Sequence, residues 1–450
     1  MIWVIIALTI VLRFYRLYQF AGFAWDQEQL LAYPVKSILQ GDLTLIGPHT
    51  GPGNVYLGPL LYYLAVPFFW IFRLHPIAGS VLASILGIST AIGVYFVCKK
   101  FFTQSLALIA LAIYATSPLF NLNDRTIWNP SLIPLASLGV LAAYLSWWKY
   151  HNASYVNLTV LATATALGIQ AHLGFIFILP LHLLIWLKFK PPLSWPKIGW
   201  FFLVAIGWFL PLIAFDLRHQ GINITNFLNF FLSGGTQFNL AAITQKWLEL
   251  MRHSLGLIGS TLIYSHVPYG NVLVGVMILL AAFWWRDYLF IAYLVIFSLG
   301  FSFYSGNVPD YYLWPILLPA VLIISLTFQQ LAHRFKVSLP ALVAIILFWF
   351  SFKTLDEFSL TPPDSLEHKS QAVQYIINRS QSQPFRVLYD TDLGRNYGFV
   401  YLFDFYGVKP SDNLSDPAFV ITIPEFFRTG RRSDVAFGSI GIINPKEISE

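Results

Sequence analysis

The chain has 450 residues, of which 57% are hydrophobic and 17% aromatic, whereas only 11% are charged. Since soluble domains carry about 25% charged residues, this composition excludes a water-soluble enzyme and a disordered chain. It also excludes a nucleic-acid-binding protein despite the net charge of +6. The single cysteine, Cys98, excludes a disulfide framework and a cysteine-ligated metal site.

Apolar stretches that could cross a bilayer recur along residues 1–355. A membrane helix needs about 20 mostly apolar residues. The first stretch lacks a basic flank and a small-residue cleavage site, so we interpret it as a span and not as a signal peptide. The stretch 58–73 contains Pro59 and Pro67, and we expect it to lie along the membrane surface. The eleven predicted spans lie near 2–18, 77–98, 104–121, 130–148, 155–171, 173–188, 198–215, 271–285, 288–304, 311–331 and 338–352.

The positions of basic residues support this count. If the N-terminus is cytoplasmic and 58–73 does not cross, the loops on the cytoplasmic side contain only one carboxylate, Asp287. Positively charged loops favour the cytoplasmic side, so the sequence predicts a multi-pass protein of the cytoplasmic membrane. If 58–73 crossed, the basic loops would divide between both sides. The basic residues of the inner loops are Lys99, Lys100, Lys149, Lys188, Lys190, Lys197, Arg286, Arg334 and Lys336.

Three outer segments follow from this topology, at 19–76, 121–129 and 216–270. Within the third, we expect 241–264 to form a surface helix because charged side chains interrupt its apolar character. These side chains are Lys246, Glu249, Arg252 and His253.

The last 95 residues differ from the rest in composition. Residues 356–450 contain 13 of the 21 carboxylates, whereas residues 1–355 contain only eight. A helix near 365–380 is followed by alternating apolar segments, which predict strands. The predicted fold class is therefore an all-α polytopic membrane protein, with surface helices and a small extracytoplasmic α/β appendage. The predicted strands lie near 385–389, 418–423 and 439–443.

Asp26 and Glu28 directly follow the first span. A carboxylate in a cavity between helices can act as a general base, and an acidic pair can hold a divalent cation. The alternative is that both side chains only solvate the start of a loop. The scarcity of carboxylates and the neighbouring Trp25 favour a functional role.

Cations on the same side suggest a phosphate ligand. Arg125, Arg218 and His219 lie at the mouths of different spans, and an arginine fork suits phosphate oxygens, most simply those of a lipid. Generic headgroup contact, or pairing with nearby carboxylates, is the alternative. A histidine in an apolar setting such as that of His172 is more often a packing residue, and Tyr311 and Tyr312 are more simply explained as interfacial aromatics. The candidates for a substrate pocket are His49, Asp124, Trp128, Asn129, His172, Tyr311 and Tyr312.

The order of these features resembles the GT-C glycosyltransferases. The similarity is greatest to the bacterial branch of family 39, which includes protein O-mannosyltransferase-like and aminoarabinose transferase-like enzymes. It covers roughly residues 10–330. It depends on the segments 12–26, 58–63, 117–130, 168–172 and 211–218.

This resemblance implies a hexosyl or pentosyl transferase of cell envelope glycans that uses a polyprenyl-phosphate sugar as donor. The acceptor would be a hydroxyl of a lipid, glycan or protein. Asp26 would deprotonate that hydroxyl, and direct displacement would invert the anomeric carbon. Arg125, Arg218 or a cation held by Asp26 and Glu28 would stabilise the departing phosphate.

Other classes of membrane protein remain as alternatives. A transporter of lipid-linked sugars would place ionisable groups near the middle of the bilayer and show inverted repeats, whereas no repeat is evident here. A glycan polymerase or ligase would concentrate its function in a late outer loop, for which 220–270 is available. A non-catalytic structural protein is a further possibility.

Overall fold

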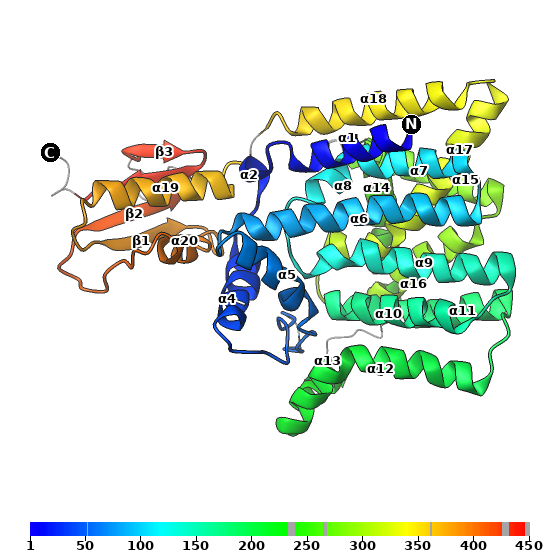
Figure 1. Cartoon of the computed structure of the whole chain (residues 1–450), viewed down its shortest axis with the longest axis horizontal. Helices are drawn as coiled ribbons and strands as arrows, with labels where there is room; N and C mark the ends of the chain where they lie inside the picture. The colour runs from blue at the N-terminus through cyan, green and yellow to red at the C-terminus, as the bar shows by residue number, and fades with distance from the viewer. Residues whose placement is uncertain (52, 233–238, 264–267, 361, 425–431, 446–450) are drawn as a thin grey trace.

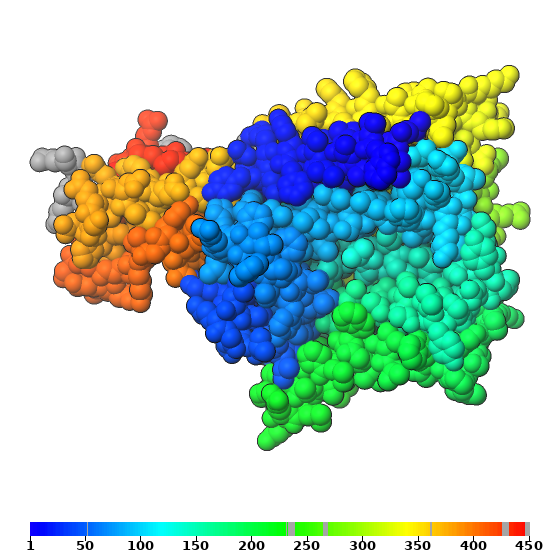
Figure 2. Space-filling model, in the orientation of Figure 1, coloured from blue at the N-terminus to red at the C-terminus, as the bar shows by residue number. Residues whose placement is uncertain are grey.

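A computed structural model of the whole chain describes residues 1–51, 53–232, 239–263, 268–360, 362–424 and 432–445. Near-parallel helices form a bundle, and a small α/β tail lies beyond one end of it (Figure 1). The first outer segment, drawn in blue, fills the space between the tail and the segment formed by α12 (Trp195–Arg218) and α13 (Ile222–Leu232), drawn in green (Figure 2). The predicted fold class, an all-α polytopic membrane protein with a small α/β appendage, is confirmed.

Each of the eleven predicted spans corresponds to a helix. Five stretches of the described chain are long and apolar enough to cross a membrane by length and composition: Ile77–Phe101, Asn129–Tyr150, Trp195–Arg218, Asp310–Arg334 and Leu339–Glu357. The helices are α1 (Ile2–Phe14), α6 (Ile77–Phe101), α7 (Gln104–Thr116), α9 (Ile133–Tyr150), α10 (Tyr155–Ala171), α11 (Ile178–Phe189), α12 (Trp195–Arg218), α15 (Pro268–Trp285), α16 (Tyr288–Ser302), α17 (Leu317–Arg334) and α18 (Leu339–Glu357).

Two predicted spans are shorter than expected for local reasons. The first ends at Phe14 because Arg16 adopts the left-handed conformation, with φ 54° and ψ 32°. The third ends at Thr116 because Ser117 precedes Pro118, and a residue before proline is pushed out of the helical region. Short helices continue the chain, namely α2 (Leu17–Phe20) and α8 (Pro118–Asn123).

The first outer segment forms several short helices outside the bundle. α4 and α5 run at a steep angle to the bundle helices (Figure 1), as expected for α5 from its prolines. Later elements are α13 (Ile222–Leu232), α14 (Leu240–Ser260) and the 3-10 helices η2 (Asn129–Leu132), η3 (Leu173–Phe177) and η4 (Asp310–Ile316). The elements of the first segment are α3 (Trp25–Gln27), the π-helix η1 (Glu28–Ala32), α4 (Tyr33–Leu39) and α5 (Leu60–Ile71).

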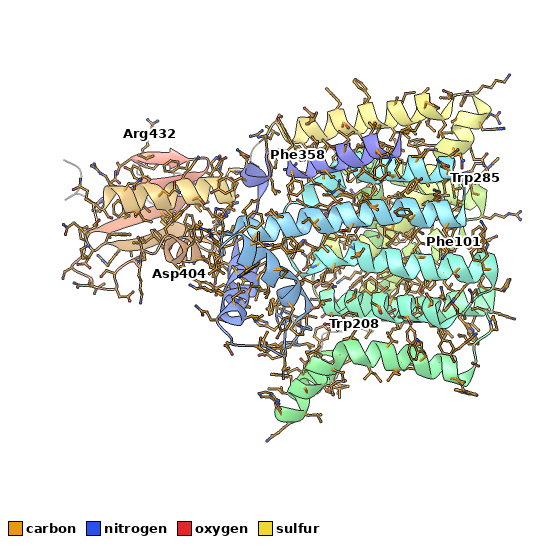
Figure 3. The ribbon with its side chains drawn as sticks, in the orientation of Figure 1. Phe101, Trp208, Trp285, Phe358, Asp404 and Arg432 are labelled. Atoms are coloured by element: carbon orange, nitrogen blue, oxygen red, sulfur yellow. The ribbon has the colours of Figure 1, made fainter. Side chains whose placement is uncertain are left out.

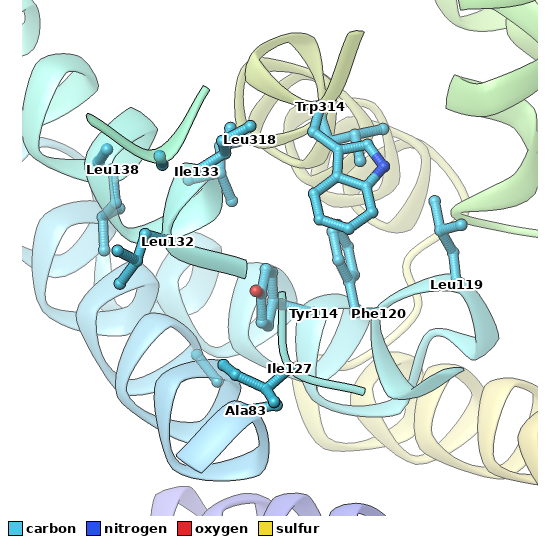
Figure 4. Close-up of a cluster of buried hydrophobic side chains, with 14 of the residues drawn as sticks. Ala83, Tyr114, Leu119, Phe120, Ile127, Leu132, Ile133, Leu138, Trp314 and Leu318 are labelled. Carbon is cyan, nitrogen blue, oxygen red and sulfur yellow. The ribbon is translucent and has the colours of Figure 1, made fainter. Parts of the chain in front are cut away.

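Small and aromatic residues determine how closely the helices pack. Tyr114 of α7 stacks on Phe120 with ring centroids 4.1 Å apart, in a cluster that also contains Trp314 (Figure 4). Gly275 of α15 lies against α14 so closely that a Cβ there would be 1.9 Å from the carbonyl oxygen of Leu255. Such close backbone approach is typical of packing between helices in a membrane.

A buried polar network joins α9, α10 and α11. The Tyr144 hydroxyl lies 2.5 Å from His182 Nδ1, and Thr165 Oγ1 lies 2.8 Å from His182 Nε2. Both ring nitrogens of His182 therefore have partners. Polar side chains that satisfy one another in this way hold membrane helices together, so this histidine has a structural explanation.

The tail contains one helix, a four-stranded sheet and a crossover helix. β1 and β2 are parallel, and their connection includes α20 (Phe399–Phe405), since parallel strands require a crossover. β4 pairs antiparallel with both β2 and β3, which gives the order β1-β2-β4-β3. The elements are α19 (Leu366–Arg379), β1 (Arg386–Thr391), β2 (Ala418–Ile423), β3 (Val435–Phe437) and β4 (Ile440–Ile443), so the three predicted strands are present and β3 was missed.

Candidate active site

A cavity of about 450 Å³ lies where the outer segments meet the bundle. The first outer segment provides Asp26, and the loops before η2 and η3 and the segment around η4 close the other sides. Six predicted pocket residues join Asp26 in its lining: His49, Trp128, Asn129, His172, Tyr311 and Tyr312.

Hydrogen bonds between the first two outer segments place Asp26. Gln27 accepts a hydrogen bond from the backbone N–H of Ala24 at 3.0 Å and donates one to the carbonyl of Ile127 at 2.8 Å. The backbone N–H of Gly22 donates to Thr126 Oγ1 at 3.2 Å. These bonds tie the start of α3 to the loop after α8, so that Asp26 faces the cavity.

The Asp26 carboxylate is half-buried and has no hydrogen bond or ion pair with any residue that the structure describes. Burial removes it from water and raises the pKa of its carboxyl group above the ordinary value. Its charge acts on the nearby Tyr311 hydroxyl. A carboxylate that is poorly solvated and has no partner is well suited to accept a proton from a bound hydroxyl.

Glu28 lies on the other side of the same segment, outside the cavity. Its Oε1 accepts a hydrogen bond from the backbone N–H of Tyr401 at 2.9 Å, and Gln29 donates to its Oε2 at 3.2 Å. The reason is helical geometry, because residues two apart on a helix point about 200° apart. Glu28 therefore does not share the cavity with Asp26, contrary to our expectation of a catalytic pair.

The same geometry bears on the expected divalent cation. Asp26 and Glu28 point apart, so they do not fit a shared metal site. Among the residues that the structure describes, no group of three or more His, Cys, Asp or Glu side chains could hold a metal ion. The reaction is therefore described below through protein side chains alone.

Aromatic rings line the same cavity as Asp26. Tyr311 lies edge-on to Trp128 with centroids 4.6 Å apart, and His172 lies 4.2 Å from the ring of Tyr312. His172 Nδ1 accepts a hydrogen bond from the backbone N–H of Gly174 at 3.1 Å. Burial lowers the pKa of His172 to about 3, so the ring is neutral and carries its hydrogen on Nε2. The cavity thus offers amphipathic rings and a neutral donor.

The second outer segment places Asp124 and Arg125 away from the cavity, contrary to our expectation. Asp124 Oδ2 lies 2.8 Å from Nη2 of Arg13, which is fully buried. Arg125 is 1% exposed, donates hydrogen bonds to the carbonyls of Leu12 and Tyr15, and lies 3.7 Å from the ring centroid of Phe358. Both residues hold the end of α1, so neither is available to bind a donor phosphate.

Arg218 and His219 also lie outside the cavity. Both are exposed at the C-terminal end of α12, and the His219 ring stacks on Phe215 with centroids 4.2 Å apart. A second, mainly apolar cavity of about 500 Å³ lies beside this end of α12. It adjoins the first, since both are lined by Leu57 and Leu173, but neither Arg218 nor His219 lines it.

A cation that we did not assign to the site, Lys246, lies next to the first cavity. Its ammonium donates to the carbonyls of Tyr304 and Gly306, both at 2.5 Å, and lies 5.4 Å from the ring centroid of Tyr304, which lines the cavity. An ammonium has three donors, so one is left over by the partners found in the described part of the chain. In the sequence, Lys246 indicated only a surface helix, and nothing there placed it near residue 304.

Comparison with known proteins identifies the fold. No protein-family model and no curated protein matches the chain. The structure of ArnT from Cupriavidus metallidurans in the apo state is similar with a TM-score of 0.63 at 11% identity, over 100% of this chain and 98% of that one. The form bound to undecaprenyl phosphate gives 0.62 at 12% identity, over 100% and 99%.

A third structure, the Archaeoglobus fulgidus oligosaccharyltransferase in the apo form, is similar with a TM-score of 0.51 at 13% identity. It is matched over 94% of this chain and 69% of its own length.

The chain has the GT-C fold. The first outer segment, which provides Asp26 to the cavity, lies at the end of the bundle where the tail is attached (Figure 1). The similarity to ArnT extends over the tail as well, since nearly all of both chains is covered.

Proposed function

We propose that this protein is a glycosyltransferase that moves a sugar from a polyprenyl-phosphate carrier to an acceptor hydroxyl, with Asp26 as general base. The observation that carries the proposal is a carboxylate with no partner among the residues that the structure describes, facing an aromatic cavity of about 450 Å³ in a GT-C fold. The ArnT structure bound to undecaprenyl phosphate supports the class of donor. The sugar is a hexose or pentose derivative, and the acceptor is a lipid, glycan or protein.

The reaction is a direct displacement. The acceptor oxygen attacks the anomeric carbon, its proton moves to the Asp26 carboxylate, and the bond from that carbon to the phosphate oxygen breaks. The electron pair leaves with the polyprenyl phosphate, and the configuration inverts. Desolvation of Asp26 makes it a stronger base than an exposed aspartate, because its pKa is raised. Aromatic rings such as Trp128 and Tyr311 flank the sugar.

The apolar second cavity suits the prenyl chain of the donor. It opens beside Tyr56, Phe209 and Phe227 and adjoins the first cavity at Leu57 and Leu173. An amphipathic donor can therefore place its sugar near Asp26 while its chain remains among apolar side chains.

Lys246 is our candidate for the cation that receives the departing phosphate. Replacing it by glutamine should raise the KM for the donor about tenfold or more, because a hydrogen bond to a charged group contributes about 1.5–3 kcal/mol. Initial rates at varied donor concentration measure this. Arg218→Gln, at an exposed cation outside both cavities, should leave KM unchanged. Equal effects of both variants would remove Lys246 from the donor site.

We propose that the cavity and the tail lie on the outer side of the cytoplasmic membrane. Phe101 and Trp285 mark the end of the bundle opposite the tail (Figure 3). The basic residues Lys99, Lys100 and Arg286 adjoin them in the chain. The positive-inside rule assigns such an end to the cytoplasm.

A transfer assay tests the proposed function. The purified protein in liposomes receives a radiolabelled polyprenyl-phosphate sugar with lipid, glycan and peptide acceptors. A glycosyltransferase moves label from the carrier to one acceptor class. A transporter moves the intact carrier between leaflets, which a membrane-impermeant glycosidase detects, and leaves the acceptors unlabelled. That second result would overturn the proposal.

A further inference from the structure

The tail is bonded to the segment that carries Asp26. The ammonium of Lys369 in α19 donates to the carbonyl of Phe23 at 2.8 Å and to the carbonyl of Tyr397 at 2.8 Å. The Glu28 carboxylate accepts the backbone N–H of Tyr401 at 2.9 Å. These contacts lie three residues before Asp26 and two residues after it, on the side away from the cavity.

The approach between the two parts is close. A Cβ at Gly398, whose φ is +96°, would lie 2.4 Å from the carbonyl oxygen of Phe23, so only glycine fits there. The rings of Trp25 and Tyr397 meet edge-on with centroids 6.3 Å apart. The backbone N–H of Leu366 donates to the carbonyl of Ala21 at 2.9 Å. The tail therefore contacts the segment 21–28 along its whole length.

Lys369 is an unusual residue to bury. It is only 2% exposed, and burial lowers its pKa to about 8. Removing an ammonium from water is costly unless fixed partners replace the water. Here two carbonyls and the ring of Phe399, 5.3 Å from the ammonium, replace it, while the charges of Glu28 and Asp364 act from nearby. The two hydrogen bonds of Lys369 thus fix the backbone at Phe23 in the first outer segment and at Tyr397 in the tail.

The opposite side of the segment is held independently. Gln27 bonds to the carbonyl of Ile127, and Gly22 bonds to Thr126, in the second outer segment. Asp26 itself has no bond to any residue in the described part of the chain. Its direction is therefore determined by the backbone, which is braced on one side by the second outer segment and on the other by the tail.

We propose that Lys369 and Glu28 are positioning residues, which brace the segment Phe23–Glu28 from the tail so that Asp26 faces the cavity. This proposal rests on the proposed function for its kinetic consequences. It gives the tail a role in the reaction although none of its residues lines the cavity in the described structure.

The test compares Lys369→Met with Lys36→Met. Lys36 also links the first outer segment to the tail, through an ion pair with Asp404, but it is partly exposed and lies outside 21–28. Lys369→Met should lower kcat by about 10- to 100-fold, as expected for a displaced catalytic group, with little change in donor KM. It should also shift the acid limb of the pH profile. Lys36→Met should change none of these.

A pair at position 28 separates positioning from loss of charge. Glu28→Gln keeps an oxygen that can accept the Tyr401 N–H and should retain most activity, whereas Glu28→Leu should resemble Lys369→Met. Unchanged kcat per folded molecule and an unchanged pH profile in Lys369→Met, with only a lower Tm, would overturn the proposal and leave a purely structural contact.

Hydrogen exchange keeps this test independent of catalysis. Amides of residues 21–28 should exchange faster in Lys369→Met than in the wild type and in Lys36→Met. If the wild type transfers no sugar, the proposed function fails, while faster exchange confined to this segment still supports the brace. Equal exchange in all three proteins would overturn it.

Discussion

Asp26→Asn should lower the transfer rate by about 100- to 10,000-fold, because a positioned general base contributes a factor of this size. Asparagine keeps the shape of the side chain but cannot accept the proton of the acceptor hydroxyl. Donor binding should be nearly unchanged, so the loss should appear in kcat. Single-turnover rates with labelled donor in liposomes measure the effect.

The matched control is Asp42→Asn, which removes an exposed carboxylate from the same outer segment. It should transfer sugar at the wild-type rate. Full activity in Asp26→Asn would exclude Asp26 from the mechanism, and equal losses in both variants would indicate a general effect of charge on this segment.

The raised pKa of Asp26 also determines how activity and stability respond to pH. A base must be ionised, so kcat/KM should fall as pH decreases through a pKa above the ordinary aspartate value of about 3.9. Because the folded-state pKa exceeds the unfolded one, the ionised form is unfavourable to folding at neutral pH. Asp26→Asn should therefore leave Tm at pH 7 unchanged or higher, as thermal unfolding in detergent would show.

Arg13→Met should be the most destabilising single change. It would leave the Asp124 carboxylate buried without its partner, since Arg13 Nη2 and Nε lie 2.8 Å and 2.9 Å from Asp124 Oδ2. Breaking a buried ion pair on one side costs about 3–5 kcal/mol. A large fall in Tm should follow, together with poor insertion of α1.

The double variant Arg13→Met with Asp124→Leu gives the control. It removes both charges, and replacing a buried pair by apolar groups of similar volume is often neutral. It should therefore recover most of the stability that Arg13→Met loses, and the cycle of single and double variants yields the coupling between the residues. A double variant as unstable as the sum of the two single ones would show that this pair is not coupled.

Apolar length predicted the bundle, because eleven apolar stretches correspond to helices. The aromatic and histidine candidates around the cavity were also identifiable, since the predicted topology places them on the same side of the bundle. The direction of the Glu28 side chain could not be predicted from the sequence. It depends on the helical conformation of 25–32, and short outer segments show little periodicity. Arg125 was misassigned because the sequence does not show that its donors are used by carbonyls of α1.

Contacts between distant parts of the chain could not be predicted from pattern alone. The bond from Lys246 to the carbonyl of Tyr304 spans 58 residues, and no spacing rule predicts it. The same holds for the contact between Lys369 and Phe23.

That last contact joins residues separated by 346 positions. Asp26, the proposed proton acceptor, is therefore translated long before Lys369, which supports its segment. On this view, a partly translated chain in the membrane already contains the acid but cannot yet use it efficiently. Products that stop before residue 369 would then be prevented from consuming carrier lipid, and catalytic competence would itself report that translation has passed this position.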